Sequence, residues 1–198
     1  MTGVTSERPK LTFPPDEAAW VEEVYDAARV ILEYGSGGST VLAGEKLGCR
    51  VFSVESDKNW CENLERWFEE NPPLADVRLH HADIGKTKAW GNPVNEKHWR
   101  KFANYPISVW DRDDFAQPDV VLIDGRFRAA CFLTVMLRTN SPVTVLFDDY
   151  KNRPNYHVVE DYVKPAEMRG RMARFEVQPR SFPTEDMAKI FEIFGIVQ

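Results

Sequence analysis

The chain has 198 residues, of which 43% are apolar, and its formal net charge is −6. This length and composition suit a globular protein with a full hydrophobic core and disfavour a disordered one. The acidic balance and the lack of a Lys/Arg run argue against a protein that binds nucleic-acid phosphates. No apolar stretch is long enough to cross a membrane, and residues 1–10 lack the apolar core of a signal peptide, so we expect a cytoplasmic protein.

Short apolar runs alternate with amphipathic stretches along the chain, which is typical of βαβ units and a parallel sheet. A first helix is predicted to begin near Pro15, and others at 41–47, 60–68, 127–137 and 156–163. Buried strands are predicted at 29–33, 50–55, 76–83, 119–124 and 143–148. The third of these strands is the least apolar, and we expect it at an edge of the sheet.

The C-terminal part of the chain is predicted to add two strands. Ala173, Phe175 and Val177 alternate with charged residues, as in a half-exposed strand. The apolar run from Met187 to Phe194 predicts a last strand, which could pair with the former as an antiparallel hairpin. The expected fold class is therefore α/β, a doubly wound and mostly parallel seven-stranded sheet with an antiparallel C-terminal strand.

Residues 84–118 have no regular pattern and contain Trp90, Trp99 and Trp110. A segment of this length is too long for a simple connector, and such loops are usually functional. We expect one domain over residues 1–198, in which this insertion acts as a lid that excludes water from a site. An ordinary satellite core around the tryptophans is the other interpretation, and it stays open.

Three signals fall at the carboxyl ends of three successive predicted strands, where ligands bind in an open parallel sheet. The turn 35–38, Gly-Ser-Gly-Gly, lets the backbone approach a ligand closely. Glu55 ends the second strand, where a carboxylate can accept hydrogen bonds from both ribose hydroxyls. Asp83 ends the third strand, where it could take an adenine amino group while Ile84 lies against the ring.

Two residues near the glycine turn separate the classes of nucleotide. A dinucleotide-binding GxGxxG signature would need glycine at position 40, where the chain has Thr40. Glu33, just ahead of the glycines, would repel a pyrophosphate but can attract an ammonium group. An enzyme that uses NAD or a sugar nucleotide is therefore the less favoured interpretation.

The segment from Ile31 to Ser39 resembles the first motif of class I S-adenosylmethionine-dependent methyltransferases, and the likeness extends in strand order over residues 14–198. The resemblance implies a Rossmann-like methyltransferase sheet with S-adenosylmethionine as cofactor. The residues it implies for cofactor binding are Glu33, Gly35, Ser36, Gly37, Glu55, Ser56, Asp83, Ile84 and Asp124. Ser39 departs from the family, because a third glycine is usual there.

Three aspartates follow the fourth and fifth strands: Asp124, Asp148 and Asp149. Neighbouring strand ends would bring them together, and convergent carboxylates suit Mg²⁺ or a similar hard cation. They resemble the ligands of metal-dependent O-methyltransferases of the macrocin and catechol types, which implies that they bind Mg²⁺ and take part in catalysis. Capping of loops at the strand ends is the alternative.

No general base is carried over from either type, because Arg126 and Phe127 stand where those families have an acid and a lysine. We expect methyl transfer to an oxygen of a small-molecule acceptor, without nucleic-acid or membrane partners. The alternative is a relative that binds the cofactor but has lost catalysis, which the lack of a base favours. Arg126 and Arg128 either clamp an anionic acceptor or lie solvated at a helix start. The sequence does not fix the oligomeric state.

Overall fold

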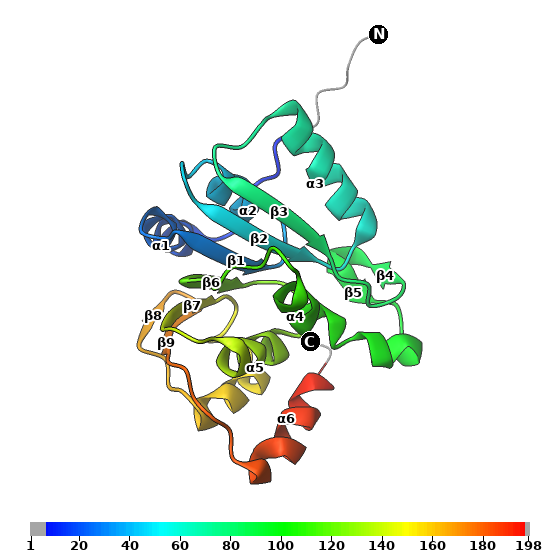
Figure 1. The fold of residues 1–198 in the computed structure, drawn as a ribbon, viewed down its shortest axis with the longest axis vertical. Helices are drawn as coiled ribbons and strands as arrows, with labels where there is room; N and C mark the ends of the chain where they lie inside the picture. The colour runs from blue at the N-terminus through cyan, green and yellow to red at the C-terminus, as the bar shows by residue number, and fades with distance from the viewer. Residues whose placement is uncertain (1–6, 197–198) are drawn as a thin grey trace.

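A central sheet of seven strands organises the protein, of which the computed structural model describes residues 7–196 (Figure 1). The strands lie in the order β3-β2-β1-β6-β7-β9-β8. Their bounds are β1 (Val30–Tyr34), β2 (Arg50–Glu55), β3 (Asp76–His81), β6 (Val120–Ile123), β7 (Val143–Phe147), β8 (Glu167–Arg169) and β9 (Met172–Val177). The first five in spatial order are parallel, and β9 runs antiparallel to both of its neighbours. The doubly wound, mostly parallel sheet and the edge position of β3 are confirmed.

Helices cover both faces of the sheet, as Figure 1 shows. On one side lie α1 (Pro15–Asp26), α2 (Gly38–Gly44) and α3 (Lys58–Glu70), and on the other α4 (Asn104–Ile107), α5 (Arg128–Arg138) and α6 (Met187–Phe194). Successive side chains of a strand point to opposite faces. Ile31 accordingly packs with Trp20 of α1, whereas Leu32 joins the cluster around Phe132 of α5.

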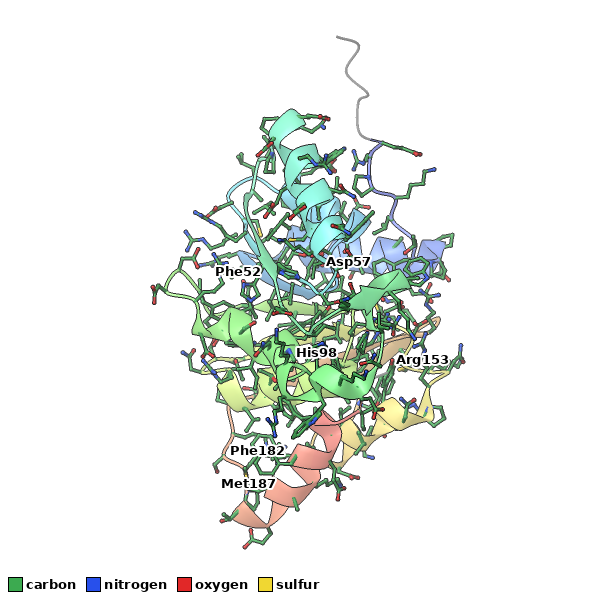
Figure 2. All side chains as sticks on the ribbon, turned by 90° about the vertical axis from the view of Figure 1, so that its right-hand side faces the viewer. Phe52, Asp57, His98, Arg153, Phe182 and Met187 are labelled. Carbon is green, nitrogen blue, oxygen red and sulfur yellow. The ribbon has the colours of Figure 1, made fainter. Side chains whose placement is uncertain are left out.

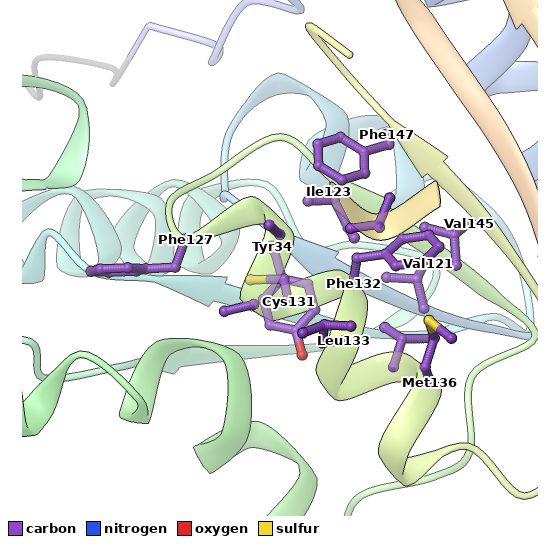
Figure 3. Packing of buried hydrophobic residues seen from close by; sticks show 14 of the residues in the cluster. Tyr34, Val121, Ile123, Phe127, Cys131, Phe132, Leu133, Met136, Val145 and Phe147 are labelled. Atoms are coloured by element: carbon purple, nitrogen blue, oxygen red, sulfur yellow. The ribbon is translucent and has the colours of Figure 1, made fainter. Parts of the chain in front are cut away.

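Helix α5 is apolar nearly all round and is buried from Arg128 to Met136. Such a helix needs protein on every side. The sheet covers one side of it, and α4, α6 and η4 (Pro154–Asp161) contact it elsewhere. Figure 3 shows Phe132 and Met136 among the strand side chains Val121 and Val145. Burying one side chain like that of Phe132 stabilises the fold by about 1.5–3 kcal/mol. The connection between β6 and α5, residues 124–127, thus joins a strand inside the sheet to a buried helix.

The irregular segment 84–118 contains short elements. They are β4 (Thr87–Lys88), η1 (Ala89–Gly91), β5 (Asn92–Pro93), η2 (Glu96–Lys101), α4 and η3 (Ser108–Asp111). Its later part belongs to the main core, because Tyr105 and Trp110 are buried in the cluster of α5. Its earlier part, the β4-β5 hairpin, carries the exposed Trp90. One half of the segment therefore packs as core, and the other half stands at the carboxyl end of β2.

The prediction of a last strand from Met187 to Phe194 is wrong, because these residues form helix α6. Ile190 and Ile193 are its buried side chains, at helical spacing, and a short apolar run does not distinguish a buried strand from a buried helix. The partner of β9 in the hairpin is instead β8, joined to it through Gly170, whose φ is 55°. Figure 2 shows Met187 at the end of the molecule away from Asp57, which begins the turn into α3.

The helix predicted near 156–163 is the 3₁₀ helix η4, and a second short one, η5 (Thr184–Asp186), precedes α6. In η4 the buried side chains are Tyr156 and Val159, three residues apart, which suits three residues per turn. Across residues 7–196, none of the helices combines the length and the apolar character that spanning a bilayer requires.

Candidate functional site

A cavity of about 650 Å³ opens at the carboxyl ends of β1, β2 and β6. Its volume falls in the range of roughly 300–1,000 Å³ that is typical of small-molecule sites. The loops after the three strands supply Gly35, Ser36, Gly37, Gly38, Ser39, Glu55, Ser56, Asp57, Asp124, Gly125 and Arg126. The other walls come from 7–13, Trp60, 89–91 and Tyr105. Six of the residues predicted for the cofactor thus lie around one cavity.

Gly35 and Gly125 bring two of these loops into direct backbone contact. Gly35 has a φ of 105°, and a Cβ there would lie 2.8 Å from the backbone nitrogen of Gly125. A Cβ on Gly125 would lie 1.9 Å from the hydroxyl of Tyr105. Gly35 therefore needs glycine on two grounds, because side chains are disfavoured at that φ and no space is left for one. Gly125 needs glycine because no space is left for a side chain. The cavity floor is backbone, which a ligand can approach closely.

The segment 7–13 forms a wall of the cavity that the sequence pattern did not indicate. It crosses the start of α2, where a Cβ on Gly38 would lie 2.3 Å from the carbonyl carbon of Lys10 and 2.4 Å from the nitrogen of Leu11. The glycine at position 38 is thus required by contact with the chain itself. This contact explains one glycine of the motif without a ligand.

Glu33 is fully buried behind the glycine loop and is not among the residues that line the cavity. Its carboxylate accepts hydrogen bonds from the hydroxyls of Tyr25, at 2.7 Å, and Ser53, at 3.0 Å. The Ser53 hydroxyl also contacts those of Ser36 and Thr40. Burial raises the pKa of Glu33, and these hydrogen bonds oppose the rise. Glu33 therefore holds the loop in place through hydroxyl groups.

Glu55 lines the cavity and is only 8% exposed. One of its oxygens accepts hydrogen bonds from the backbone N–H groups of Ser56 and Asp57, at 2.6 and 2.7 Å. Burial raises the pKa of Glu55, and the backbone donors lower it. The hydroxyl of Ser56 donates to the carbonyl of Gly91, which fixes the β4-β5 hairpin over this end of β2.

Asp83 and Ile84 do not line the cavity. The Asp83 carboxylate pairs with Lys101 at 2.6 Å and accepts the N–H of Gly85 at 2.8 Å, and the contact with Lys101 lowers its pKa. Ile84 is fully buried in the main core. The end of β3 is thus occupied by a surface ion pair and a core residue.

The predicted convergence of Asp124, Asp148 and Asp149 is confirmed, since each offers an oxygen within 4.8 Å of the others. Asp124 lines the cavity, with 29% of its side chain exposed. Asp148 is fully buried, and Asp149 takes a φ of 58°, which is rare for a residue with a side chain. We call these three residues the aspartate cluster.

Two arginines form ion pairs with Asp148 and Asp149 of the aspartate cluster. Arg171 donates to both oxygens of Asp148, at 3.0 and 2.7 Å, and lies 3.2 Å from Asp149. Arg153 donates to Asp149 at 2.7 Å. The bidentate contact is the geometry in which a guanidinium binds a carboxylate most strongly, and the pKa of Arg171 is raised by Asp148.

Arg128 is the third arginine that contacts the aspartate cluster, and it is only 3% exposed. It lies 3.1 Å from an oxygen of Asp124 and 3.4 Å from one of Asp149, and it donates to the backbone carbonyls of Gly125 and Asp148. Three guanidiniums therefore balance three carboxylates. A divalent cation placed among them would meet three positive charges, so the residues present do not fit Mg²⁺ as their resident partner.

Burial raises the pKa of Asp124 to about 7. Arg128 opposes this rise, and the carboxylates of Asp148 and Asp149 add to it. A carboxylate that lines a cavity and has a pKa near neutrality is suited to accept a proton from a bound ligand.

Arg126 is half-buried and lines the cavity. Its Nη1 donates to Asn92 at 3.2 Å, and its Nε is buried without a hydrogen-bond partner. Within the part of the chain described, no carboxylate lies within 4 Å of it. Arg126 is thus a cation that faces the cavity, whereas Arg128 is committed to the fold.

Two tryptophans stand at the cavity, Trp60 and Trp90. The indole of Trp60 donates to the carbonyl of Ser36 at 2.8 Å, and the residue is exposed. It lies in the first turn after the cap Asp57, and the first turn of a helix that follows a strand is near the ligand end of the sheet. Trp90 is 81% exposed and has a φ of 64°.

The chain is similar to a solved methyltransferase-like protein from Silicibacter pomeroyi DSS-3. The two share 44% sequence identity over 95% of this chain and 98% of that chain, with a TM-score of 0.92. No family model and no curated protein matches the chain.

More distant structures share the fold alone. An O-methyltransferase from Bacillus cereus, solved in complex with SAH, is 13% identical over 86% of this chain and 84% of that chain, with a TM-score of 0.53. A tRNA (m1A58) methyltransferase from Aquifex aeolicus is 12% identical over 88% of this chain and 73% of that chain, with a TM-score of 0.54. The same sheet thus carries different acceptors, so the acceptor must be argued from the site.

Proposed function

Because this chain belongs to the methyltransferase family with the class I fold, we propose that it binds S-adenosylmethionine and methylates an oxygen of a small-molecule acceptor. The observation that carries the proposal is the cavity itself. It joins the glycine loop, the carboxylate of Glu55 and the carboxylate of Asp124 at the carboxyl ends of three adjacent strands.

The cofactor's parts are assigned by chemistry. We propose that the backbone of 35–37 holds the methionine end and that Glu55 accepts hydrogen bonds from the ribose hydroxyls. Ser56 and Trp60 line the same cavity as Glu55, and we propose that they supply the surface for the adenine. The positions of Asp83 and Ile84 outside the cavity disfavour the adenine contacts expected from the sequence, and Glu33 acts through the loop instead.

We propose that the acceptor binds at the Asp124 side of the cavity. When bound, the cofactor supplies a methyl group on a sulfonium centre whose thioether leaves readily. The chain's own residues hold the reactants in line, which can lower a barrier by roughly 7–11 kcal/mol. Asp124 takes the proton of the acceptor hydroxyl as the oxygen forms its bond to the methyl carbon.

Magnesium assistance is the rival proposal for the aspartate cluster. We favour charge balance by Arg128, Arg153 and Arg171, since their contacts already use both oxygens of Asp148, both of Asp149 and one of Asp124. Calorimetric titration of the SAH-loaded protein with Mg²⁺ tests this. We expect no stoichiometric binding. Binding that an Asp148→Asn variant loses would support the metal instead.

A cofactor-binding protein without catalysis is the second candidate. The ion pair of 3.1 Å between Asp124 and Arg128 favours it, because a carboxylate held by a guanidinium is a weaker base. Release of SAH from S-adenosylmethionine in the presence of hydroxylated acceptors separates the candidates. Turnover that Asp124→Asn abolishes supports the enzyme.

Calorimetry with S-adenosylhomocysteine tests the binding proposal first. We expect a dissociation constant on the order of micromolar, lost in Glu55→Ala and kept in Asp83→Ala. The second variant is a matched control, because Asp83 also follows a strand of the sheet closely but lies outside the cavity. Urea unfolding of both variants shows whether they are folded. No binding to the folded wild-type protein would overturn the proposal.

A further inference from the structure

We propose that the acceptor carries an anionic oxygen group, a carboxylate or a phosphate, and that Arg126 binds it. This inference rests on the proposed function and deepens it, since it names the class of acceptor for the same cavity. The acceptor hydroxyl would then be methylated while the anionic group holds the molecule in place.

The four arginines around the β6–α5 connection differ in their partners. Three of them, Arg128, Arg153 and Arg171, have carboxylate partners within the aspartate cluster. Arg126 has no carboxylate within 4 Å among residues 7–196, and it is the one of the four that lines the cavity. A positive charge at a cavity wall that has no carboxylate within ion-pair distance attracts anions.

The hydrogen bonds of Arg126 are also incomplete. A guanidinium has five N–H donors, and the side chain of Arg126 makes one hydrogen bond, to Asn92, while its Nε is buried without a partner. A buried donor that lacks an acceptor costs free energy. Burial and the nearby charge of Arg128 lower the pKa of Arg126. A bound carboxylate or phosphate would supply both the missing acceptor and the missing charge.

The surroundings of Arg126 fit an acceptor with an apolar body. Trp90 lines the same cavity and is largely exposed. Its φ of 64° is unfavourable for a residue with a side chain, and such strain is concentrated at functional sites. An aromatic or otherwise flat acceptor can lie against Trp90 while its anionic group meets Arg126.

The spacing of Arg126 from Asp124 completes the argument. The two residues belong to the same loop, separated by Gly125, and both line the cavity. An acceptor held by Arg126 therefore presents nearby groups to Asp124. The class that suits this arrangement is a hydroxy acid or a hydroxylated phosphate, in which the reacting hydroxyl lies close to the anionic group.

Binding of simple probes tests the inference without knowledge of the natural acceptor. The SAH-saturated protein is titrated with benzoate, phenyl phosphate and the neutral benzamide, and the tryptophan fluorescence is recorded. We expect at least one of the two anions to bind about tenfold or more tightly than benzamide, which corresponds to a charge-assisted contact. The anion that binds more tightly shows whether the acceptor's anionic group is a carboxylate or a phosphate.

Three variants assign the preference to Arg126. Arg126→Met should bind all probes equally, and Arg126→Lys should keep a weaker preference, because it keeps the charge but loses the fork of donors. Arg100→Met is the matched control, since Arg100 is exposed and lies over Trp99, and it should behave as wild type.

The outcomes separate this inference from the proposed function. Failure of SAH to bind contradicts the proposed function itself. Normal SAH binding with no anion preference, or with a preference that Arg126→Met retains, overturns only the assignment of an anionic acceptor to Arg126.

Discussion

The two sides of the cavity hold their carboxylates in opposite ways. At the ends of β1 and β2, Glu33 is held by hydroxyl groups and Glu55 by backbone N–H groups, and neither has an ion-pair partner among the described residues. At the ends of β6 and β7, every member of the aspartate cluster contacts at least one guanidinium. Carboxylates satisfied by neutral donors keep their attraction for a cation, whereas carboxylates paired with arginine do not.

This difference assigns separate tasks to the two sides. A positively charged ligand such as a sulfonium with an ammonium group is favoured at the β1–β2 side. On the β6–β7 side the carboxylates of the aspartate cluster are matched by arginines, and Arg126 lines the cavity with no carboxylate within 4 Å among the described residues. From this difference between the two sides we expect a cationic cofactor at the β1–β2 side of the cavity and an anionic acceptor at the β6–β7 side.

The largest effect is expected from Gly35→Ala, which disrupts the loop after β1 on the β1–β2 side of the cavity. The added Cβ meets backbone 2.8 Å away at a φ of 105°, so we expect a loss of about 3–5 kcal/mol in unfolding free energy and loss of SAH binding. Gly48→Ala is the control, because Gly48 has a φ of 76° but open space around it. It should cost about 1–2 kcal/mol. Urea unfolding measures both, and equal losses would contradict the role of the close contact.

Asp124→Asn tests the aspartate side in catalysis. Loss of the base should lower the rate of SAH release by about 10²–10⁴-fold. In the wild type the pKa of Asp124 is raised to about 7, so the deprotonated fraction, and the rate with it, increases with pH. The rate should rise about tenfold per pH unit below that value and level off above it. A flat pH profile over this window would argue against Asp124 as the base, and Asp83→Asn should leave the profile unchanged.

Arg171→Met tests the charge balance of the aspartate cluster. It leaves the buried Asp148 without its bidentate partner, which in a fully buried pair costs about 3–5 kcal/mol. Because 32% of the Arg171 side chain is exposed, we expect about 2–3 kcal/mol of unfolding free energy. Adding Asp148→Asn should recover part of the loss in a double-mutant cycle. Strictly additive losses would mean that the pair does not interact.

Glu33→Gln should have the smallest effect on the unfolding free energy. It tests whether Glu33 supports the glycine loop or contacts the ligand. The amide keeps one acceptor oxygen but offers a donor to the second hydroxyl, so we expect a loss of about 1 kcal/mol in unfolding free energy. The affinity for SAH, measured by calorimetry, should fall less than about tenfold. A complete loss of SAH binding in folded Glu33→Gln would instead place Glu33 in contact with the ligand.

Strands β1, β2, β6 and β7 could be predicted because they are largely apolar runs that end in an acid or are followed by glycine or an acid. Residues 50–55, for example, were predicted with the bounds of β2. The helix α6 could not be distinguished from a strand, since its eight residues are too few and too apolar for periodicity to decide. The edge strand β8 has three residues and no apolar pattern, so only its pairing with β9 reveals it.

The site was predictable where it depends on strand ends and unpredictable where it depends on distant contacts. The glycine turn, Glu55 and Asp124 follow from the strand ends. The wall 7–13 and the indole of Trp60 come from tertiary packing, which no local pattern encodes. Likewise, the arginines of the aspartate cluster come from three separate segments, and nothing in their spacing indicates that they meet.

The packing of Lys10 and Leu11 on Gly38 has a consequence for the order in which the site is assembled. During synthesis, this stretch leaves the ribosome before the helix start on which it rests. It has no surface to dock on until α2 has formed, and the floor between Gly35 and Gly125 needs residues later still. The first wall of the cavity to be synthesised therefore has to wait for residues made later before it can take its place.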